Sequence, residues 1–402
     1  MLSYSELTPE LKLLVLCSAT GNEKKRNDIN KLINSGINWS MFIKLALQHK
    51  VYPLVFQHLR ALAHPNVPDK LLKDLYKLKK DNDFKTLQMV TEFSKILQAL
   101  EQRGISVIVI KGFPLAQQLY GDITLRTSRD IDILISADDI AAARHIMEQY
   151  GYQWNHSLAN ATAGRLKKWM AFNQHLEYWH PERQICIELH WRLDCQSMEL
   201  PFNLLRKNGV SMHILGREIN VLGKEELLLY LILHGAVHRW FRIKWLLDID
   251  IMIRKQDFSW EKLCLLANQL GFMVVLNQAF ILARELLGTP LPRDISNRAD
   301  MDTKAKHLAC LALQFIKDNG FASKITFKTK AIILFKYTRY EFKLKTGWRG
   351  QFICIFRYFL PTESDLELVA LSERLYFIYY IIAPLSWVYK RTRNVIKMLA
   401  KG

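Results

Sequence analysis

The chain has 402 residues, enough to bury a large core and to build two or three structural units. Hydrophobic residues make up 50% of it and charged residues 23%, a balance that excludes an intrinsically disordered chain. The net charge is +18, and residues 321–402 carry 15 Lys and Arg against 5 Asp and Glu. More than half of the excess therefore lies in the last fifth of the chain, which predicts attraction to polyanions, RNA included, unless this is simply a solvated basic face.

Targeting and membrane signals are weak. The N-terminus has no basic leader before an apolar stretch, so we expect no secretory signal. The longest apolar run, Leu375–Tyr389, is interrupted by Pro384 and is shorter than the ~20 residues of a membrane helix. We predict a buried helix there and no transmembrane segment. Six scattered cysteines without a CxxC pair predict reduced thiols in a cytoplasmic protein.

The first hundred residues have a helical pattern. Apolar side chains recur at spacings of three and four, for example in Leu11–Leu16, Met41–Leu47 and Leu71–Leu78. A longer pattern begins at Phe84 and ends at Gly104. We therefore predict an N-terminal helical region over residues 1–103.

Beyond Gly104 the pattern changes to that of short strands. Ile105–Ile110 is a β-branched run typical of a buried strand, and a helix is predicted over Pro114–Tyr120. A second strand follows at Asp130–Ile135, then a helix that Ser136 caps. Gln184–Arg192 alternates as a third strand, which places Ile185, Ile187 and Leu189 on one face and Cys186, Glu188 and His190 on the other.

The rest of the chain is again helical. Helices are predicted over Lys224–Trp240, Ile243–Arg254 and Trp260–Leu287. The predicted fold is α+β: a small mixed sheet flanked by helical regions at both ends. The predicted domain limits are 1–103 for the N-terminal helices, 104–222 for the α/β core, 223–320 for a helical domain and 321–402 for a basic helical C-terminal region.

Three acidic residues of the predicted sheet form a candidate metal site. Residues two apart in a strand project from the same face, roughly 6.5–7 Å apart, so Asp130 and Asp132 point together. Glu188 lies on the polar face of another strand and would add a third carboxylate. Like charges so close favour a cation between them, and oxygen ligands suit Mg²⁺. Replacing either aspartate by asparagine should leave the fold intact, because it removes a repulsion.

The turn after the first strand is a candidate phosphate site. Lys111 and Gly112 precede the helix Pro114–Tyr120, so its N-terminal N–H groups would face the sheet edge. Lys111 would add a positive charge for a triphosphate. Arg126 and Arg129 flank the acidic pair and would either grip the triphosphate or pair with Asp130 and Asp122.

Histidines form a second group of candidates. His190 shares a strand face with Glu188, where it would line the site or orient the carboxylate. His234 and His238 are four apart on a predicted helix, which is metal-ligand spacing, but no third ligand is evident. We expect a structural or substrate-facing pair. Asp248 is expected to pair with a nearby base.

Several of these stretches, in order, resemble a known family. They are Ile108–Tyr120, Arg126–Ile135, Ile187–Arg192, Leu228–His238 and Lys244–Asp248. This pattern is similar to that of the uncharacterised bacterial nucleotidyltransferase-like family, part of the polymerase-β nucleotidyltransferase superfamily, and covers about residues 85–255. The resemblance implies transfer of a nucleoside monophosphate from an NTP such as ATP to an unknown acceptor, with release of pyrophosphate.

The resemblance also implies roles for individual residues. Asp130 and Asp132 would hold Mg²⁺, and Glu188 would be the third acid, as ligand or as base. Gly112 would lie in the turn that approaches the phosphates. The chain departs from the pattern at Lys111, where the superfamily usually has glycine before serine or glycine, and at Glu188, where aspartate is more common.

Three kinds of function stay open. The leading hypothesis is an enzyme that modifies a small molecule, a sugar phosphate or a peptide. A second is a toxin–antitoxin or phage-defence nucleotidyltransferase that modifies a protein or a tRNA end, which the basic C-terminal region would suit. A third is a catalytically inactive scaffold that binds a nucleotide or polyanion. A glycosyltransferase, which also uses a DxD motif, is disfavoured because no nucleotide-binding domain precedes residue 104.

Overall fold

The computed structural model describes most of the chain. Its residues are 6–19, 23–154, 163–170, 173–194, 199–255, 257–318, 327–344 and 373–386. Helices surround a central β-sheet in this structure, so the predicted α+β class is confirmed.

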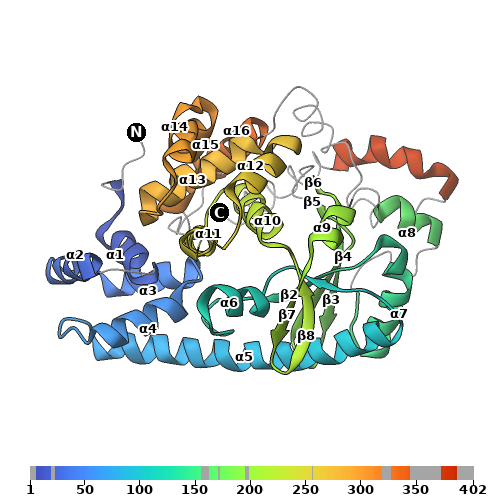
Figure 1. Ribbon diagram of the computed structural model, residues 1–402, viewed down its shortest axis with the longest axis horizontal. Coiled ribbons are helices and arrows are strands. Elements are labelled where there is room, and N and C mark those ends of the chain that lie inside the picture. Colours follow the sequence, from blue (N-terminus) through green and yellow to red (C-terminus); the bar gives the residue numbers. More distant parts are fainter. Residues whose placement is uncertain are drawn as a thin grey trace.

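The described part of the N-terminal region consists of five helices, in agreement with the predicted helical pattern. They are α1 (Pro9–Ser18), α2 (Glu23–Asn34), α3 (Trp39–Gln48), α4 (Tyr52–Leu62) and α5 (Asp69–Gln102). Thr8 and Asn38 cap α1 and α3, each accepting a hydrogen bond from a backbone N–H three residues ahead. The long helix α5 runs beneath the sheet and connects it with the other N-terminal helices (Figure 1).

The central sheet has six strands in the order β3-β4-β2-β1-β8-β7. Their bounds are β1 (Ile108–Val109), β2 (Asp130–Leu134), β3 (His175–His180), β4 (Ile185–His190), β7 (Val210–Ile214) and β8 (Arg217–Val221). β2 runs parallel to β4 and antiparallel to β1, while β3 pairs antiparallel with β4. The sequence predicted β1, β2 and β4; β3 and the β7–β8 hairpin are additional.

The register of β2 and β4 decides which side chains share a face. Asp132 is opposite Glu188, and Asp130 is opposite Cys186. The intervening apolar side chains lie on the other face, where they pack against α5 and the helix α7 (Ile140–Gln149). They are Ile131, Ile133, Ile135, Ile185, Ile187 and Leu189. The polar residues of both strands therefore lie together on the opposite face.

Shorter elements connect the strands. The helix α6 (Phe113–Tyr120) follows β1, and Ser136 caps the turn η2 (Ala137–Asp139) that begins α7, both close to the predicted positions. The helices α8 (Ala163–Met170) and α9 (Phe202–Asn208) and the small ladder β5 (Leu193–Asp194) with β6 (Glu199–Leu200) complete this region.

Within the described residues, six further helices follow the sheet in sequence up to residue 318. They are α10 (Lys224–Val237), α11 (Ile243–Lys255), α12 (Trp260–Gln269), α13 (Met273–Leu287), α14 (Arg293–Met301) and α15 (Thr303–Asp318). The prediction of one continuous helix over Trp260–Leu287 is wrong. Gly271 adopts a left-handed φ of 73°, so the chain turns there and α13 starts anew.

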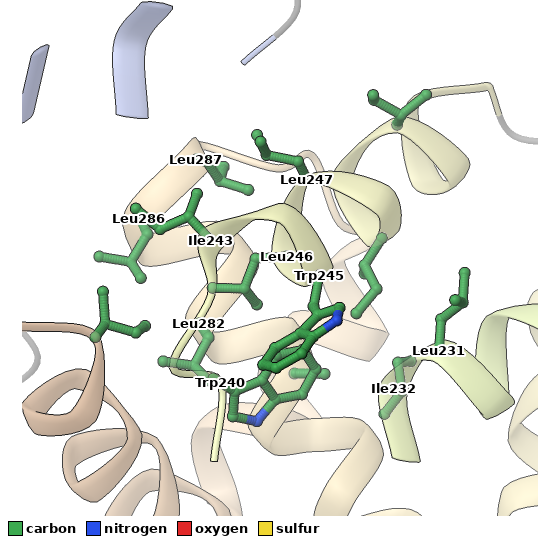
Figure 2. Packing of buried hydrophobic residues seen from close by; sticks show 14 of the residues in the cluster. Leu231, Ile232, Trp240, Ile243, Trp245, Leu246, Leu247, Leu282, Leu286 and Leu287 are labelled. Atoms are coloured by element: carbon green, nitrogen blue, oxygen red, sulfur yellow. The ribbon is translucent and has the colours of Figure 1, made fainter. Parts of the chain in front are cut away.

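Helices α10, α11 and α13 pack through large side chains around Trp240 and Trp245 (Figure 2). Trp240 is fully buried, and its ring lies directly against Gly235 of α10. A Cβ at position 235 would lie 2.3 Å from that ring, so only glycine fits. This close contact fixes the corner between α10 and α11 on which His234 and His238 lie.

One hydrophobic cluster joins the two ends of the described chain. It contains side chains of α1, α3 and α4 together with side chains of α10–α15. A second cluster lies between α5, α7 and the far face of the sheet. The N-terminal helices and the helices after residue 223 thus share one core, while the domain limits proposed above stay predictions.

The C-terminal region is described only over α16 (Phe327–Leu344) and residues 373–386. The rest of the basic region, and the end of the apolar run from Leu375, lie outside the described residues. Residues 373–386 are helical as predicted, beginning with the 3-10 turn η4 (Glu373–Ile378), but they are only partly buried. Tyr379 and Ala383 are buried, whereas Phe377, Ile381 and Leu385 are at least 60% exposed. The apolar residues cover both faces of this segment, and only one face packs on the protein. No helix among the described residues is long and apolar enough to cross a membrane.

Four cysteines fall within the described residues, and all four are free thiols. Cys17 and Cys186 are buried, Cys264 is half-buried, and Cys310 is exposed. Cys195 and Cys354 lie outside the described residues.

Candidate active site

Three carboxylates meet on the polar face of the sheet. Asp130 and Asp132 extend from β2, and Glu188 extends from the adjacent parallel strand β4. One oxygen of each lies within 4.8 Å of the others. The structure therefore brings together the three acids that the two-residue alternation of the strands placed on one face.

Lys111 holds Asp132 at the centre of this group. Its Nζ is 2.8 Å from Asp132 Oδ1, and Asp132 is completely buried. Burial lowers the pKa of Lys111, but the charge of Asp132 outweighs it and raises the pKa well above 10.5. Burial raises the pKa of Asp132, but Lys111 and His190 together hold it well below 3.8. Both side chains are therefore charged at neutral pH.

Asp130 is in a different electrostatic state from Asp132. Burial and the neighbouring charge of Asp132 raise the pKa of Asp130 to about 6. A carboxylate with this pKa is ionised at neutral pH but takes up a proton readily in mild acid. Lys111 and Lys244 lower this pKa, but among the described residues they compensate Asp130 less than Lys111 and His190 compensate Asp132.

His190 connects Asp132 with Glu188. Its Nε2 is 3.1 Å from Glu188 Oε2 and 3.5 Å from Asp132 Oδ1. Burial lowers the pKa of His190, but its hydrogen bonds with the two carboxylates raise it above 6.5. His190 therefore lies between the carboxylates of Asp132 and Glu188, and the two roles suggested by the sequence, lining the site or orienting Glu188, stay predictions.

Gly112 forms the turn between β1 and α6. Its φ of 87° and ψ of −137° belong to a region that side-chain-bearing residues avoid. The first turn of α6 lacks a side-chain cap, and Pro114 occupies one of its first positions. A Cβ at Gly112 would lie 3.9 Å from the backbone oxygen of Asp130, so this turn lies against the start of β2.

Arg126 is buried and bound within the protein. Its Nε donates to both oxygens of Asp248, at 3.1 and 3.0 Å, and the hydroxyl of Tyr120 donates to the same carboxylate. Both charged side chains are at most 4% exposed. The expected partner of Asp248 is thus Arg126, and this ion pair joins the 121–129 loop to α11.

Arg129 is exposed and lies among other cations. Thr127 donates to the backbone oxygen of Lys50, and Lys244 donates to the backbone oxygen of Thr127. These bonds bring the loop before β2 against the turn between α3 and α4 and against the start of α11. Burial lowers the pKa of Lys50, and the charges of Arg129 and Arg242 lower it further. Lys50, Arg129 and Arg242, which we call the basic rim, form no ion pair among the described residues.

His234 and His238 lie at the end of α10, with ring centroids 4.6 Å apart. His238 also stacks on Trp245 of α11 at 5.1 Å. Burial lowers the pKa of both histidines, followed by the positive charge of Lys111, to about 4 for His238. Both imidazoles are therefore neutral at neutral pH. Because the charge of Lys111 acts on both rings, they also lie near the acidic group. No third ligand joins them among the described residues.

Sequence reasoning missed several residues around the site. Lys50 and Arg242 come from helical regions far from the sheet in sequence, and nothing local distinguishes them from solvated cations. His175 lies opposite His190 on β3, a strand that was not predicted. The alternation from His175 to His180 is a strand signal that could have found it.

The donor set fits a hard divalent cation. Asp132 Oδ2 is buried and has no hydrogen-bond partner among the described residues, although Oδ1 faces Lys111. Buried carboxylate oxygens are normally partnered, and Asp130 and Glu188 offer further oxygens within 4.8 Å. Oxygen donors with incomplete coordination suit Mg²⁺, which keeps several waters or phosphate oxygens.

Comparison with known families matches residues 35–288 to a family described as uncharacterised nucleotidyltransferases. The match covers more than half of the 402 residues and includes the sheet, its acidic group and helices α10–α13. The chain belongs to this family. No curated protein and no solved structure matches the chain.

Membership in the nucleotidyltransferase family agrees with the resemblance noted from the motifs. It supports the general class of activity, a transferase that uses a nucleotide. The matched region begins within the N-terminal helices, between α2 and α3, and therefore includes Lys50 of the basic rim. The helices that contribute Lys50, Arg242 and the histidine pair are thus part of the family unit and not additions to it.

Proposed function

We propose that this protein is a magnesium-dependent nucleotidyltransferase that transfers a nucleoside monophosphate from an NTP to an acceptor hydroxyl or phosphate, releasing pyrophosphate. One observation carries the proposal: Asp130, Asp132 and Glu188 converge beside the Gly112 turn, and a buried oxygen of Asp132 has no partner in the part of the chain that the structure describes. Such an arrangement stabilises a protein poorly and suits cation-assisted phosphoryl chemistry.

The three carboxylates would hold the metal. When bound, Mg²⁺ would neutralise charge on the phosphates during the transfer. Lys111 keeps Asp132 ionised at all physiological pH values, so that this carboxylate stays ready to bind a cation. Arg126 acts at a distance: its pair with Asp248 fixes the loop that leads into β2.

The basic rim would receive the triphosphate. Arg129 directly precedes Asp130, and Lys50 and Arg242 approach it from two helical regions. The Gly112 turn would let backbone N–H groups of α6 approach the same phosphates. The side chain of Lys111 is already bound to Asp132, so we assign it to the carboxylates first and to the phosphates second.

Glu188 would serve as the proton acceptor when the acceptor is a hydroxyl. The acceptor oxygen bonds to the α-phosphorus, and the bond from that phosphorus to the bridging oxygen breaks, which releases pyrophosphate. The hydroxyl proton passes to Glu188, which His190 contacts at 3.1 Å and orients. His234 and His238, neutral at the border of the site, would line the acceptor side.

The direct test is transfer of label. Purified protein is incubated with each α-labelled NTP, Mg²⁺ and, in separate reactions, small-molecule extract, total tRNA or total protein. We expect labelled product and pyrophosphate in one acceptor fraction, and loss of both with Asp130→Asn. A tRNA or protein product would select the toxin or defence alternative. Nucleotide binding without transfer to any fraction would instead support the third alternative, a catalytically inactive nucleotide-binding scaffold. In such a scaffold the ammonium of Lys111 would take the place of Mg²⁺ beside Asp132.

Charge removal in the basic rim should weaken nucleotide binding. A charge-assisted hydrogen bond contributes about 1.5–3 kcal/mol, so Arg129→Ala should raise the Kd for NTP about 10- to 100-fold. Lys50→Ala and Arg242→Ala should act in the same direction. Arg293→Ala, an exposed arginine on α14, is the matched control. Equal Kd values for Arg129→Ala and Arg293→Ala would remove the basic rim from the proposal.

Magnesium affinity should fall in mild acid. Asp130 has a pKa of about 6, so below this pH a proton occupies the carboxylate and competes with the cation. Protonated His190 acts in the same direction because it holds Asp132 and Glu188. We expect the apparent Mg²⁺ affinity to drop by about tenfold or more per pH unit below pH 6 and to level off above pH 7.5. Calorimetric titration at several pH values measures this, and a constant affinity from pH 5 to 8 would contradict it.

A further inference from the structure

A second set of potential metal ligands lies beside the three carboxylates. His175 of β3 and Glu188 and His190 of β4 each offer one ligand atom, and these atoms all lie within 4.8 Å of one another. The antiparallel register places His175 directly opposite His190, and their ring centroids are 4.8 Å apart. Glu188 belongs to both sets, whereas the two imidazoles belong only to this one.

Both imidazoles have a nitrogen without a partner. Nδ1 of His175 and Nδ1 of His190 are buried and form no hydrogen bond among the described residues. His190 is only 4% exposed, so water does not readily compensate its ring. Buried polar atoms are nearly always partnered, and these two adjacent nitrogens are available to bind a further ligand.

The chemistry of these donors differs from that of the aspartates. Two imidazole nitrogens and one carboxylate oxygen form a mixed set that suits borderline transition metals, whereas Mg²⁺ prefers oxygen alone. Three protein ligands also leave coordination positions open for water or a substrate group. The strand pairing supplies rigidity, because all three ligands come from two hydrogen-bonded strands.

We propose that His175, His190 and Glu188 form a binding site for a divalent transition metal ion of the Zn²⁺, Mn²⁺ or Co²⁺ type, next to the site of the aspartates. The proposal does not depend on nucleotidyl transfer, because it rests on the donor atoms and their unpartnered nitrogens. Because Glu188 is also the third acid of the carboxylate group, the bound ion would hold its side chain in one orientation.

Co²⁺ is the probe, since its visible absorption reports the ligand type. The full chain is stripped with a chelator and titrated with Co²⁺ in the presence of millimolar Mg²⁺. We expect one Co²⁺ per chain, and at least about a 100-fold weaker Kd for His175→Ala. His175→Cys should retain binding and add an intense thiolate-to-cobalt absorption band, which rules out simple unfolding as the cause of a loss.

Two further variants serve as controls. His213→Ala removes an exposed histidine of β7 and should leave the titration unchanged. Asp130→Asn should also retain Co²⁺, while it loses nucleotidyl transfer. Absence of Co²⁺ binding, or equal binding by wild type and His175→Ala, would overturn the proposal, as would loss of Co²⁺ in Asp130→Asn. Failure of the transfer assay leaves this result untouched, so the two proposals fail separately.

Discussion

Asp132→Asn is expected to abolish nucleotidyl transfer and also to lower the free energy of unfolding by about 3–5 kcal/mol. Asp132 is completely buried, and its carboxylate balances the buried ammonium of Lys111 at 2.8 Å. The neutral amide would remove the direct ion-pair partner of this ammonium and leave it only the weaker influence of Asp130 and Glu188. The expectation from like-charge repulsion, that the fold tolerates asparagine here, therefore applies to only one of the two aspartates.

Asp130→Asn is the matched variant. Transfer should again fall by about 1000-fold or more, but stability at neutral pH should be equal or higher. The pKa of Asp130 rises from 3.8 to about 6 on folding, so the folded protein binds this proton more tightly than the unfolded chain. The metal-free wild type should gain stability from this group as the pH falls from 6 towards 3.8. The Asn variant should lack that gain.

Urea unfolding of the chelator-treated proteins at pH 5 and pH 7.5 separates these outcomes. The Lys111→Met/Asp132→Leu double variant, which removes both charges, should recover much of the stability lost in Asp132→Asn. If Asp132→Asn and Asp130→Asn unfold at the same urea concentration at pH 7.5, the ion pair with Lys111 does not stabilise the fold as described.

Asp248→Ala is expected to destabilise the protein by a similar amount, about 3–5 kcal/mol. The variant would leave Arg126 as an unpaired charge at a site where the guanidinium is only 4% exposed, and the Tyr120 hydroxyl would lose its acceptor. Because this pair joins α11 to the loop before β2, activity should fall as well. The fall should come through kcat, since neither residue reaches the phosphates in our assignment.

An exposed ion pair provides the control for Asp248→Ala. Asp300→Ala breaks a contact with Arg284 at the surface, where such pairs contribute about 0–1 kcal/mol. Equilibrium unfolding in urea measures both. The Arg126→Met/Asp248→Leu double variant should be more stable than Asp248→Ala alone. A loss below 1 kcal/mol in Asp248→Ala would mean that Arg126 finds water or another acceptor.

The sequence predicted the parts of the site that depend on local periodicity. Alternation predicted that Asp130 and Asp132 share one face of their strand and that Glu188 and His190 share one face of theirs. In the structure β2 and β4 pair in a register that brings these two faces together. It also predicted that Ile185, Ile187 and Leu189 lie on the face opposite Glu188. These properties follow from the two-residue repeat and need no knowledge of distant contacts.

The remaining features depend on contacts between distant parts of the chain. Arg126 was a candidate for the triphosphate, but Asp248, 122 residues later, binds it instead. Lys111, which was expected to face the triphosphate, contacts Asp132, because a fully buried carboxylate is stable only beside a cation. Lys50 reaches the basic rim through a hydrogen bond from Thr127 that spans 77 residues. No local pattern encodes such pairings.

The shared core of the first and last helices affects how the protein matures. Ile243 donates to His49 across 194 residues, and Lys317 pairs with Glu6 across 311. Contacts between residues so far apart in sequence form late in folding, because closing a long loop costs conformational entropy before the contacts can stabilise the fold. During synthesis the sheet can assemble first, while Lys50 and Arg242 come together only after the helices that follow residue 223 have left the ribosome. The acidic group, already paired with Lys111, would thus exist before the basic rim is complete, and the nascent chain would not bind a nucleotide through this rim until α11 had joined the fold.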